Sequence, residues 1–418
     1  MKLPDSWKEN RLKDIAVHKT AKNKDLKYTE TYTNSATLGI VRQMDYFDKE
    51  ISNKENIAGY YIVEEGDYVY NPRISASAPC GPIRKSHIKE TGIMSPLYTV
   101  FKITEKNLSD DYLEQYFKST FWHSYMKTVA NYGARYDRMN ITTEDFFNIP
   151  IPFPPLAEQQ KIAEILCKQD KIISSKQKLL EQKLQQKKWL MQKLLEIPLT
   201  DANDEEKFSL GGVVIDKSGW KKEILGNLLD FKNGINSDKE KYGYGIKMIS
   251  VMDILSDNPI TLDSIKSSVE ISDDELKTYS VTYGDILFQR SSENYEDAGS
   301  SNVYIDGKHT VTFSGFVIRG KKKGDYEPLC LNAILNTDSN RSQIRKKAAG
   351  AQHINIGQDS LKSIQIYLPS LPEQKIIAQV LSTADKEIAL LKSSIEQEKQ
   401  KKKSLAQLLL TGTVRVKI

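Results

Sequence analysis

The chain repeats itself, and this internal repeat constrains its fold more than any other feature. The segment FPPLAEQQKIAEIL at 153–166 corresponds to LPSLPEQKIIAQVL at 368–381. Two earlier segments also match in the same order, Trp7–Leu12 with Trp220–Leu225 and Gly66–Tyr70 with Gly284–Phe288. The number of residues between matching positions is slightly smaller for the first of these and slightly larger for the second. Loop insertions in two copies of one fold would produce such a drifting offset. The sequence therefore predicts two similar halves, and a length of 418 residues is too great for a single ordinary domain.

A long helix is predicted at the end of each copy. Prolines stand near the start of both segments and no glycine interrupts either, so we expect helices from Leu156 to about Glu196 and from Leu371 to about Leu410. Each has one apolar stripe, which includes Leu184 in the first helix, on a surface rich in Lys, Gln and Glu. The simplest way to bury both stripes is an antiparallel coiled coil with a pseudo-twofold axis. The alternative is that each helix packs on its own domain.

A mixed region of about 150 residues precedes each long helix. Four short apolar runs predict strands, at 68–70, 97–101, 286–288 and 316–318. Gly-Asp steps before two of these strands predict turns that Asp67 and Asp285 cap. The run Lys321-Lys322-Lys323 lies between glycines, which indicates a hairpin tip.

Helices are also expected within the mixed regions. Apolar residues every four positions predict one helix from Asp111 to about Ala130, with a weaker equivalent around Leu329–Leu335. The predicted fold class is therefore α+β, with two similar mixed α/β domains separated by two long antiparallel helices. The predicted segments are a first mixed domain at 1–155, a central helix at 156–197, a polar linker at 198–217, a second mixed domain at 218–370, and a second long helix with a tail at 371–418.

Composition excludes several classes of protein. No run of about 18 apolar residues exists, which argues against a membrane helix. The N-terminus lacks the apolar segment of a secretory signal. Cys80, Cys167 and Cys330 lie far apart without a CxxC pair, so we expect neither a disulfide framework nor a zinc site, and a cytoplasmic location is the default expectation.

The sequence also lacks the motif of an enzyme. No P-loop occurs, and the five histidines form no ligand pair. Tyr70-Asn71-Pro72-Arg73 comes closest to the amino-group clamp of an adenine methyltransferase, but the second proline and the aromatic residue are missing, so we interpret it as a turn. Gly243-Tyr244-Gly245 is a lone GxG. We expect no catalytic residue, no cofactor and no metal.

The repeated motifs resemble those of type I restriction–modification specificity subunits. The proline-rich entries followed by LAEQQKIA at 156–163 and LPEQKIIA at 371–378 are similar to the helical regions of that family. The openings at Trp7 and Trp220, the Gly-Asp steps, and the closing KSLAQLLLTG at 403–412 are similar as well. The resemblance covers nearly the whole chain. One departure is Glu196-Ile197-Pro198, where the second copy has Thr411-Gly412-Thr413.

The resemblance implies a function and a set of partners. It implies two target-recognition domains that each recognise half of a bipartite site in double-stranded DNA. It further implies helices that set the spacer and dock two methyltransferase subunits, through which restriction or translocase subunits can join. The specificity subunit itself has no catalytic activity. The alternative hypothesis is a tandem coiled-coil adaptor that binds proteins and not DNA.

Two polar regions in each mixed domain are candidates for DNA contact. They combine the residue types that contact base edges and phosphates, and they occupy corresponding places in the two copies. In the first domain the candidates are Asn71, Arg73, Ser75, Ser77, Asn131, Arg135, Tyr136 and Arg138. In the second they are Gln289, Arg290, Ser291, Asn294, Lys346, Lys347, Gln352 and His353.

The net charge of +5 belongs to the helices rather than to these domains. The segments 156–196 and 371–410 together carry 16 lysines and 10 acidic residues, whereas 1–155 and 218–370 are close to neutral. Neutral domains suggest that local loops recognise DNA and that partner subunits supply much of the phosphate contact.

Overall fold

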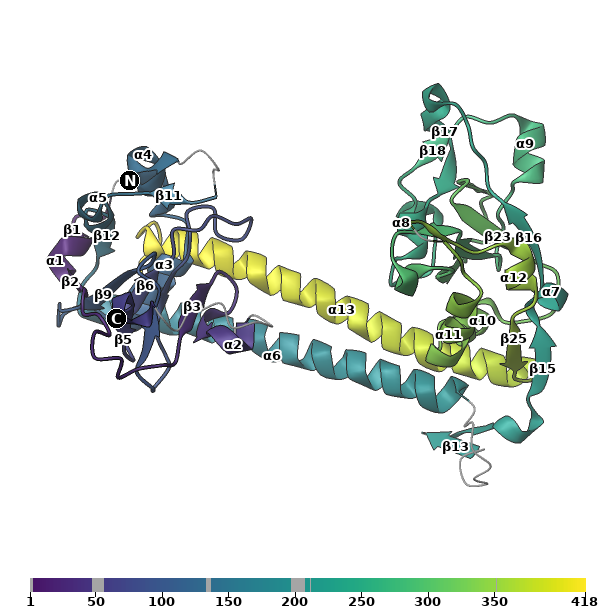
Figure 1. The fold of residues 1–418 in the computed structure, drawn as a ribbon, viewed down its shortest axis with the longest axis horizontal. Coiled ribbons are helices and arrows are strands. Elements are labelled where there is room, and N and C mark those ends of the chain that lie inside the picture. Colours follow the sequence, from purple (N-terminus) through teal and green to yellow (C-terminus); the bar gives the residue numbers. More distant parts are fainter. Residues whose placement is uncertain (1–2, 47–55, 133–136, 197–206, 211, 351) are drawn as a thin grey trace. The chain divides into compact units, whose positions relative to one another are not determined.

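The computed structural model describes residues 3–46, 56–132, 137–196, 207–210, 212–350 and 352–418 (Figure 1). The chain divides into two compact units. Unit 1 comprises Met1–Gln177 with Ser394–Ile418, and unit 2 comprises Lys178–Ser393. Each unit is described by itself.

Unit 1 begins with the first mixed domain, called head 1 below. Its elements are β1 (Lys8–Arg11), α1 (Leu12–Ile15), β2 (Ala16–His18), β3 (Tyr32–Ser35), β4 (Gly39–Arg42), α2 (Gln43–Tyr46), β5 (Tyr61–Val63), β6 (Tyr68–Tyr70), β7 (Ile83–Lys85), β8 (Gly92–Met94), β9 (Thr99–Ile103), α3 (Asp110–Lys118), α4 (His123–Val129), β10 (Asn131–Tyr132), β11 (Met139–Asn140), α5 (Thr143–Phe147) and β12 (Pro150–Phe153), followed by the long helix α6 (Leu156–Leu195).

Unit 2 contains the second mixed domain, called head 2. Its elements are β13 (Lys207–Leu210), β14 (Val213–Asp216), β15 (Lys221–Ile224), α7 (Leu225–Leu228), β16 (Leu229–Asn233), β17 (Tyr242–Ile249), α8 (Val251–Ile254), β18 (Ser268–Val269), α9 (Asp273–Thr278), β19 (Ile286–Gln289), β20 (Ser291–Ser292), β21 (Ser301–Val303), β22 (Thr312–Phe313), β23 (Val317–Lys322), α10 (Pro328–Leu335), α11 (Asp338–Lys346), β24 (Ile354–Asn355), α12 (Gln358–Lys362) and β25 (Gln365–Leu368), followed by the long helix α13 (Leu371–Leu410).

The central sheets of the two heads have the same strand order. It is β2-β9-β6-β7 in head 1 and β16-β23-β19-β21 in head 2, with every neighbouring pair antiparallel. A separate antiparallel pair, β1-β12 or β15-β25, joins the start of each head to the strand before its long helix. The repeat in the sequence is therefore a repeat of one fold, as predicted.

The Gly-Asp turns of the two heads are built alike. Gly66 and Gly284 have φ of +88° and +89°, a left-handed conformation that favours glycine. The carboxylate of Asp67 accepts from the backbone N–H of Glu64 at 2.7 Å, and that of Asp285 accepts from Thr282 N–H at 2.9 Å. Both aspartates cap their turns, which confirms the prediction.

The two long helices pack against each other in an antiparallel direction. Within unit 1, Asp170 of α6 pairs with Lys402 of α13 at 2.5 Å, and Lys176 pairs with Glu398 at 2.8 Å. Within unit 2, Lys187 of α6 pairs with Asp385 of α13 at 2.5 Å. In the alignment of the two helix starts, Asp170 corresponds to Asp385 and Lys187 corresponds to Lys402. The ion pairs Asp170–Lys402 and Lys187–Asp385 are therefore equivalent in the repeat. In each unit the paired positions rise along α6 as they fall along α13, which confirms the predicted antiparallel pair.

A buried glutamine fixes the first turn of each long helix to its head. In head 1, Gln159 accepts from Ser109 N–H at 2.8 Å and donates to the carbonyl of Pro154 at 2.8 Å. In head 2, Gln374 accepts from Glu327 N–H at 2.8 Å and donates to the carbonyl of Pro369 at 2.8 Å. Ser109 and Glu327 are the N-caps of α3 and α10. In each copy this glutamine therefore joins the long helix to the start of α3 or α10 and to the segment that follows β12 or β25.

Four local predictions were wrong. The single helix expected over Asp111–Ala130 is two helices, α3 and α4, because Ser119 caps the first and a turn intervenes. Its counterpart in head 2 likewise has a second helix, α11, that the sequence pattern missed. Lys321 and Lys322 continue strand β23 opposite β16 and form no hairpin tip. Leu184 of the predicted stripe is 45% exposed.

The segment predicted as a polar linker, 198–217, contains a strand pair. Strands β13 and β14 pair in an antiparallel direction, while 197–206 and 211 lie outside the described residues. In the described part of the chain, no helix is both long enough and apolar enough to cross a membrane.

Candidate nucleic-acid interface

The two polar regions predicted in head 1 meet in the structure. The segment after β6 runs beside the segment that forms β11, where Ile74 N–H donates to the carbonyl of Asp137 at 2.9 Å and Met139 N–H donates to that of Pro72 at 3.0 Å. Strand β11 in turn pairs with β10, which brings Asn131 opposite Asn140. Residues that are far apart in the sequence thus share one surface.

The corresponding regions of head 2 meet in the same way. Strand β20, which follows β19, pairs with β24 so that Ser291 lies opposite Asn355. Ile356 N–H donates to the carbonyl of Arg290 at 3.0 Å. The correspondence of position seen in the sequence is therefore a correspondence in space within each head.

A concave site lies at this junction in both heads. In head 1 a cavity of about 470 Å³ is lined by Tyr70, Pro72, Pro96, Leu97, Thr99, Asn131, Arg138, Met139, Asn140, Ile141, Thr142, Thr143 and Phe146. In head 2 a cavity of about 480 Å³ is lined by Asn233, Arg290, Asn355, Ile356, Gly357, Gln358 and Asp359. The Asn-Ile step of the repeat, at 140–141 and 355–356, contributes to both.

Most of the predicted residues expose their side chains, and two of the exposed ones, Asn131 and Arg138, line the cavity of head 1. In head 1 the exposed ones are Arg73, Ser75, Ser77, Asn131 and Arg138. In head 2 they are Asn294, Lys346, Lys347, Gln352 and His353. Arg135 and Tyr136 lie outside the described residues.

The four described candidates whose side chains are not exposed bond within their head. Asn71 donates to the carbonyl of Asn34 at 2.9 Å, and Gln289, which is 4% exposed, donates to that of Ser291 at 3.0 Å. Arg290 is half-buried and donates to the carbonyl of Gly315 at 3.2 Å, and the Ser291 hydroxyl donates to the side chain of Asn355. Asn71 and Gln289 hold the backbone of the site in place, whereas Arg290 also lines the cavity.

The sequence analysis missed several residues that line the cavities. Asn140, Asn355 and Gln358 present polar side chains there, as do Thr142 and Thr143 in head 1. The signal was available for the first two, because the Asn-Ile step recurs in both copies. Gln358 and the threonines carry no comparable pattern.

The second of the paired helices carries a basic residue at the same repeat position in each head. Arg341 of α11 donates to the carbonyls of Glu296 and Ala298, both at 2.9 Å, and burial lowers the pKa of its guanidinium to about 10. The corresponding position in α4 of head 1 is His123, at the same offset that relates the Gly-Asp turns of the two heads. Burial lowers the pKa of His123 to about 4, so its imidazole is neutral at pH 7.

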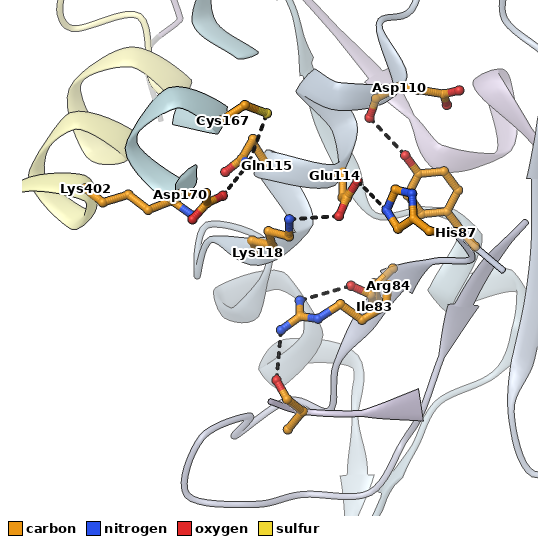
Figure 2. Close-up of polar contacts among 12 residues, drawn as sticks. Ile83, Arg84, His87, Asp110, Glu114, Gln115, Lys118, Cys167, Asp170 and Lys402 are labelled. Atoms are coloured by element: carbon orange, nitrogen blue, oxygen red, sulfur yellow. Dashed lines mark hydrogen bonds and ion pairs between the residues drawn. The ribbon is translucent and has the colours of Figure 1, made fainter. Parts of the chain in front are cut away.

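Head 1 also has a polar network on the side facing the long helices (Figure 2). Glu114 of α3 lies between Lys118 at 2.8 Å and His87 at 3.1 Å, and Gln115 reaches Asp170 of α6 at 2.8 Å. Lys118 and His87 hold the pKa of the Glu114 carboxyl below its usual value despite burial, which raises it. Arg84 donates to the carbonyl of Ala36 at 3.0 Å and so ties the loop after β3 to the sheet.

Nothing in the described residues suggests a catalytic metal. No group of three or more His, Cys, Asp or Glu side chains comes together there as a metal site. The features that recur in both heads are concave surfaces with amide and guanidinium groups, to which head 1 adds hydroxyls, and these are groups that contact nucleic acid.

The fold and these paired sites define a class of two-headed recognition proteins with an antiparallel helical pair. The family model for the type I restriction modification DNA specificity domain matches the chain twice, at residues 4–185 and 217–400. The chain therefore belongs to this family, which confirms the resemblance found in the sequence.

Individual relatives agree with the family assignment. The chain is 24% identical to the type I restriction enzyme MjaVIII specificity subunit of Methanocaldococcus jannaschii, over 100% of this chain and 95% of that protein. Its fold matches a chain from a structural study of complex assembly and conformational transition in a type I restriction–modification system. The TM-score is 0.62, with 14% identity over 99% of this chain and 100% of that one. It also matches the type I S subunit from M. genitalium, with a TM-score of 0.53 and 13% identity over 98% of each chain.

Proposed function

We propose that this chain is the DNA-recognition subunit of a type I restriction–modification complex. Residues 1–155 form one target-recognition domain and residues 218–370 the other, and each recognises one half of a bipartite target in double-stranded DNA. As a specificity subunit it is the non-catalytic component, and methyl transfer belongs to a partner.

The observation that supports this function best is the pair of cavities at matching positions in the two heads. The framework around them is the same, since both lie where the strand after the Gly-Asp turn meets the Asn-Ile step. Their linings differ, with Arg138 and Asn131 in head 1 but Arg290 and Gln358 in head 2. A common frame with different polar groups suits a ligand that is contacted twice at two different sequences.

The helical pair is proposed to dock two methyltransferase subunits and to set the spacer of the DNA site. Its exposed surface is rich in lysine, and the two repeats would offer each subunit an equivalent surface. Restriction or translocase subunits would join through the methyltransferase subunits. The adaptor hypothesis is not favoured, because the chain belongs to a DNA-specificity family.

The decisive experiment is to map methylated bases in cells that contain the partner methyltransferase, with and without this chain. We expect a bipartite methylated motif only when the chain is present, and no methyl transfer by the purified chain alone. Arg73→Ala should weaken recognition of one half-site by about 1–3 kcal/mol, the range for a lost bidentate base contact. Lys106→Ala, also exposed in head 1, is the matched control. An identical methylation pattern without the chain would overturn the proposal.

A further inference from the structure

Both heads contain the same β-turn just before the strand that crosses the middle of the sheet. In head 1, Tyr98 N–H donates to the carbonyl of Ser95 at 3.1 Å, and in head 2, Val317 N–H donates to that of Ser314 at 2.9 Å. Ser95 and Ser314 are separated in the sequence by the same number of residues as Tyr98 and Val317. The two turns are therefore repeat equivalents, although their central residues differ: Pro96-Leu97 in one and Gly315-Phe316 in the other.

Each turn presents a large apolar side chain to solvent at its third position. Leu97 is 57% exposed and Phe316 is 63% exposed. A single exposed apolar residue needs no explanation. Here the same position is apolar and exposed in both copies, while the residue before it has changed from proline to glycine. Loops of this kind are usually polar, so an apolar tip in both diverged copies indicates a shared use.

The tips lie at the proposed DNA sites. Leu97 itself lines the cavity of head 1, together with Asn131 and Arg138. In head 2 the turn is bonded to Arg290, which lines the cavity there. The backbone N–H of Arg290 donates to the carbonyl of Phe316 at 2.9 Å, and the Arg290 guanidinium donates to the carbonyl of Gly315 at 3.2 Å. Each apolar tip therefore stands beside polar groups suited to base edges.

We infer that Leu97 and Phe316 are apolar DNA-contacting residues, one for each half-site. An apolar side chain beside a base-recognition surface can contact the thymine methyl group or insert against the face of a base. The phenyl ring of Phe316 can stack on a base, whereas Leu97 offers only an apolar contact. Head 2 therefore depends on its tip more strongly than head 1. This inference rests on the proposed function.

The test uses the full chain assembled with its methyltransferase partner and a duplex that carries the target found by methylation mapping. Two further duplexes have either half-site scrambled. Phe316→Ala should lower affinity for the intact target about tenfold or more, the loss expected for a base-stacking aromatic. The loss should be confined to the half-site of head 2. Scrambling that half-site should therefore lower the affinity of the variant much less than it lowers the affinity of the wild type. Leu97→Ala should have the smaller effect, confined to the other half-site.

The control is Met252→Ala, because Met252 of α8 is also a highly exposed apolar residue of head 2 and lines neither DNA cavity. Phe316→Trp should retain affinity if stacking is the contact. Unchanged half-site discrimination in Phe316→Ala, with a wild-type complex that does discriminate, would overturn the inference alone. Loss of complex assembly without loss of discrimination, seen by size-exclusion chromatography, would assign the tip to a protein contact and also overturn it. A wild-type complex that shows no discrimination would instead refute the proposed function.

Discussion

The two heads share a framework but differ where each packs against the long helices. In head 1, Gln115 of α3 donates to Asp170 of α6 at 2.8 Å. The equivalent of Gln115 in α10 of head 2 is Ala333, and no such bond can form there. A cavity of about 650 Å³ remains between α10, α13 and the residues after α8, and Ala333, Asn302 and Asp385 are among the residues that line it.

The contacts that both heads retain run from a side chain to the backbone. Gln159 and Gln374 make the same two bonds to backbone groups, and Asp67 and Asp285 cap the same turn. A bond to backbone survives substitution of the partner residue, whereas a bond such as Gln115–Asp170 needs both side chains. The heads could therefore diverge in sequence without losing the attachment of each head to its helix.

The largest expected effect comes from removing the glutamine anchors. Gln159→Ala should destabilise unit 1 by about 3 kcal/mol, because buried backbone groups lose their partners at about 1–3 kcal/mol each. Gln374→Ala should cost unit 2 less, since Gln159 makes an additional bond to the carbonyl of Asn107 at 3.1 Å. Local stability of α3 and α10 can be measured by hydrogen exchange with mass spectrometry.

The matched control for the anchors is Gln160→Ala, the exposed neighbour in the same turn, which should change stability by less than about 0.5 kcal/mol. Equal losses for Gln159→Ala and Gln160→Ala would show that the buried bonds do not hold the head on its helix.

The glutamates before the two anchors, Glu158 and Glu373, also distinguish the heads, because they make different contacts in the two copies. Glu158 is 1% exposed and accepts from Trp7 Nε1 at 3.0 Å and from Arg415 at 2.8 Å, whereas Glu373 caps its own helix through Ser370 N–H at 3.1 Å. Glu158→Ala leaves a buried indole N–H and a guanidinium unpaired and should cost about 2–3 kcal/mol. Glu373→Ala loses a cap and should cost about 1 kcal/mol. Chemical denaturation measures both, and equal costs would contradict the difference in role.

The repeat made the overall fold predictable, and the long helices most of all. Leu156 and Leu371 begin both helices as expected, since the proline entry and the uninterrupted apolar stripe are local signals. The break between α3 and α4 was not predictable from the stripe, because Leu113, Phe117, Phe121 and Tyr125 keep a helical spacing across it.

The regions of the candidate site were predictable, but the orientation of single side chains was not. The regions adjoin recognisable repeat anchors, so the sequence places them together. Whether an amide points to solvent or to a backbone carbonyl depends on loops far away in the sequence. Gln289, for example, is buried beside residues of its own head and donates to Ser291.

Acid pH should affect the two heads unequally. His123 in head 1 has its pKa lowered to about 4 by burial, from an ordinary 6.5, so the folded state binds fewer protons than the unfolded state. Stability from this group is fully present above pH 6.5 and is lost as pH falls toward 4. From pH 7 to 5.5 unit 1 should lose about 1 kcal/mol, after allowance for partial exposure of the imidazole. The counterpart in head 2, Arg341, does not titrate in this range.

Hydrogen exchange at the two pH values, corrected for intrinsic rates, measures this difference. In His123→Gln the acid sensitivity of unit 1 between pH 7 and 5.5 should shrink, and the part that remains is expected from His18, whose pKa burial also lowers. If the variant keeps the full pH sensitivity of unit 1, another group is responsible.

The smallest expected effect comes from giving head 2 the contact that only head 1 has. Ala333→Gln places a donor beside the cavity of about 650 Å³, where Asp385 already pairs with Lys187 at 2.5 Å, just as Asp170 pairs with Lys402 in unit 1. The new bond should stabilise unit 2 by about 0.5–1 kcal/mol, the usual net gain of a hydrogen bond. Gln115→Ala should produce the opposite change in unit 1. Ala333→Leu separates the two causes, because it fills the same space without a donor. If leucine stabilises unit 2 as much as glutamine does, the cavity volume rather than the missing hydrogen bond distinguishes the heads at this surface.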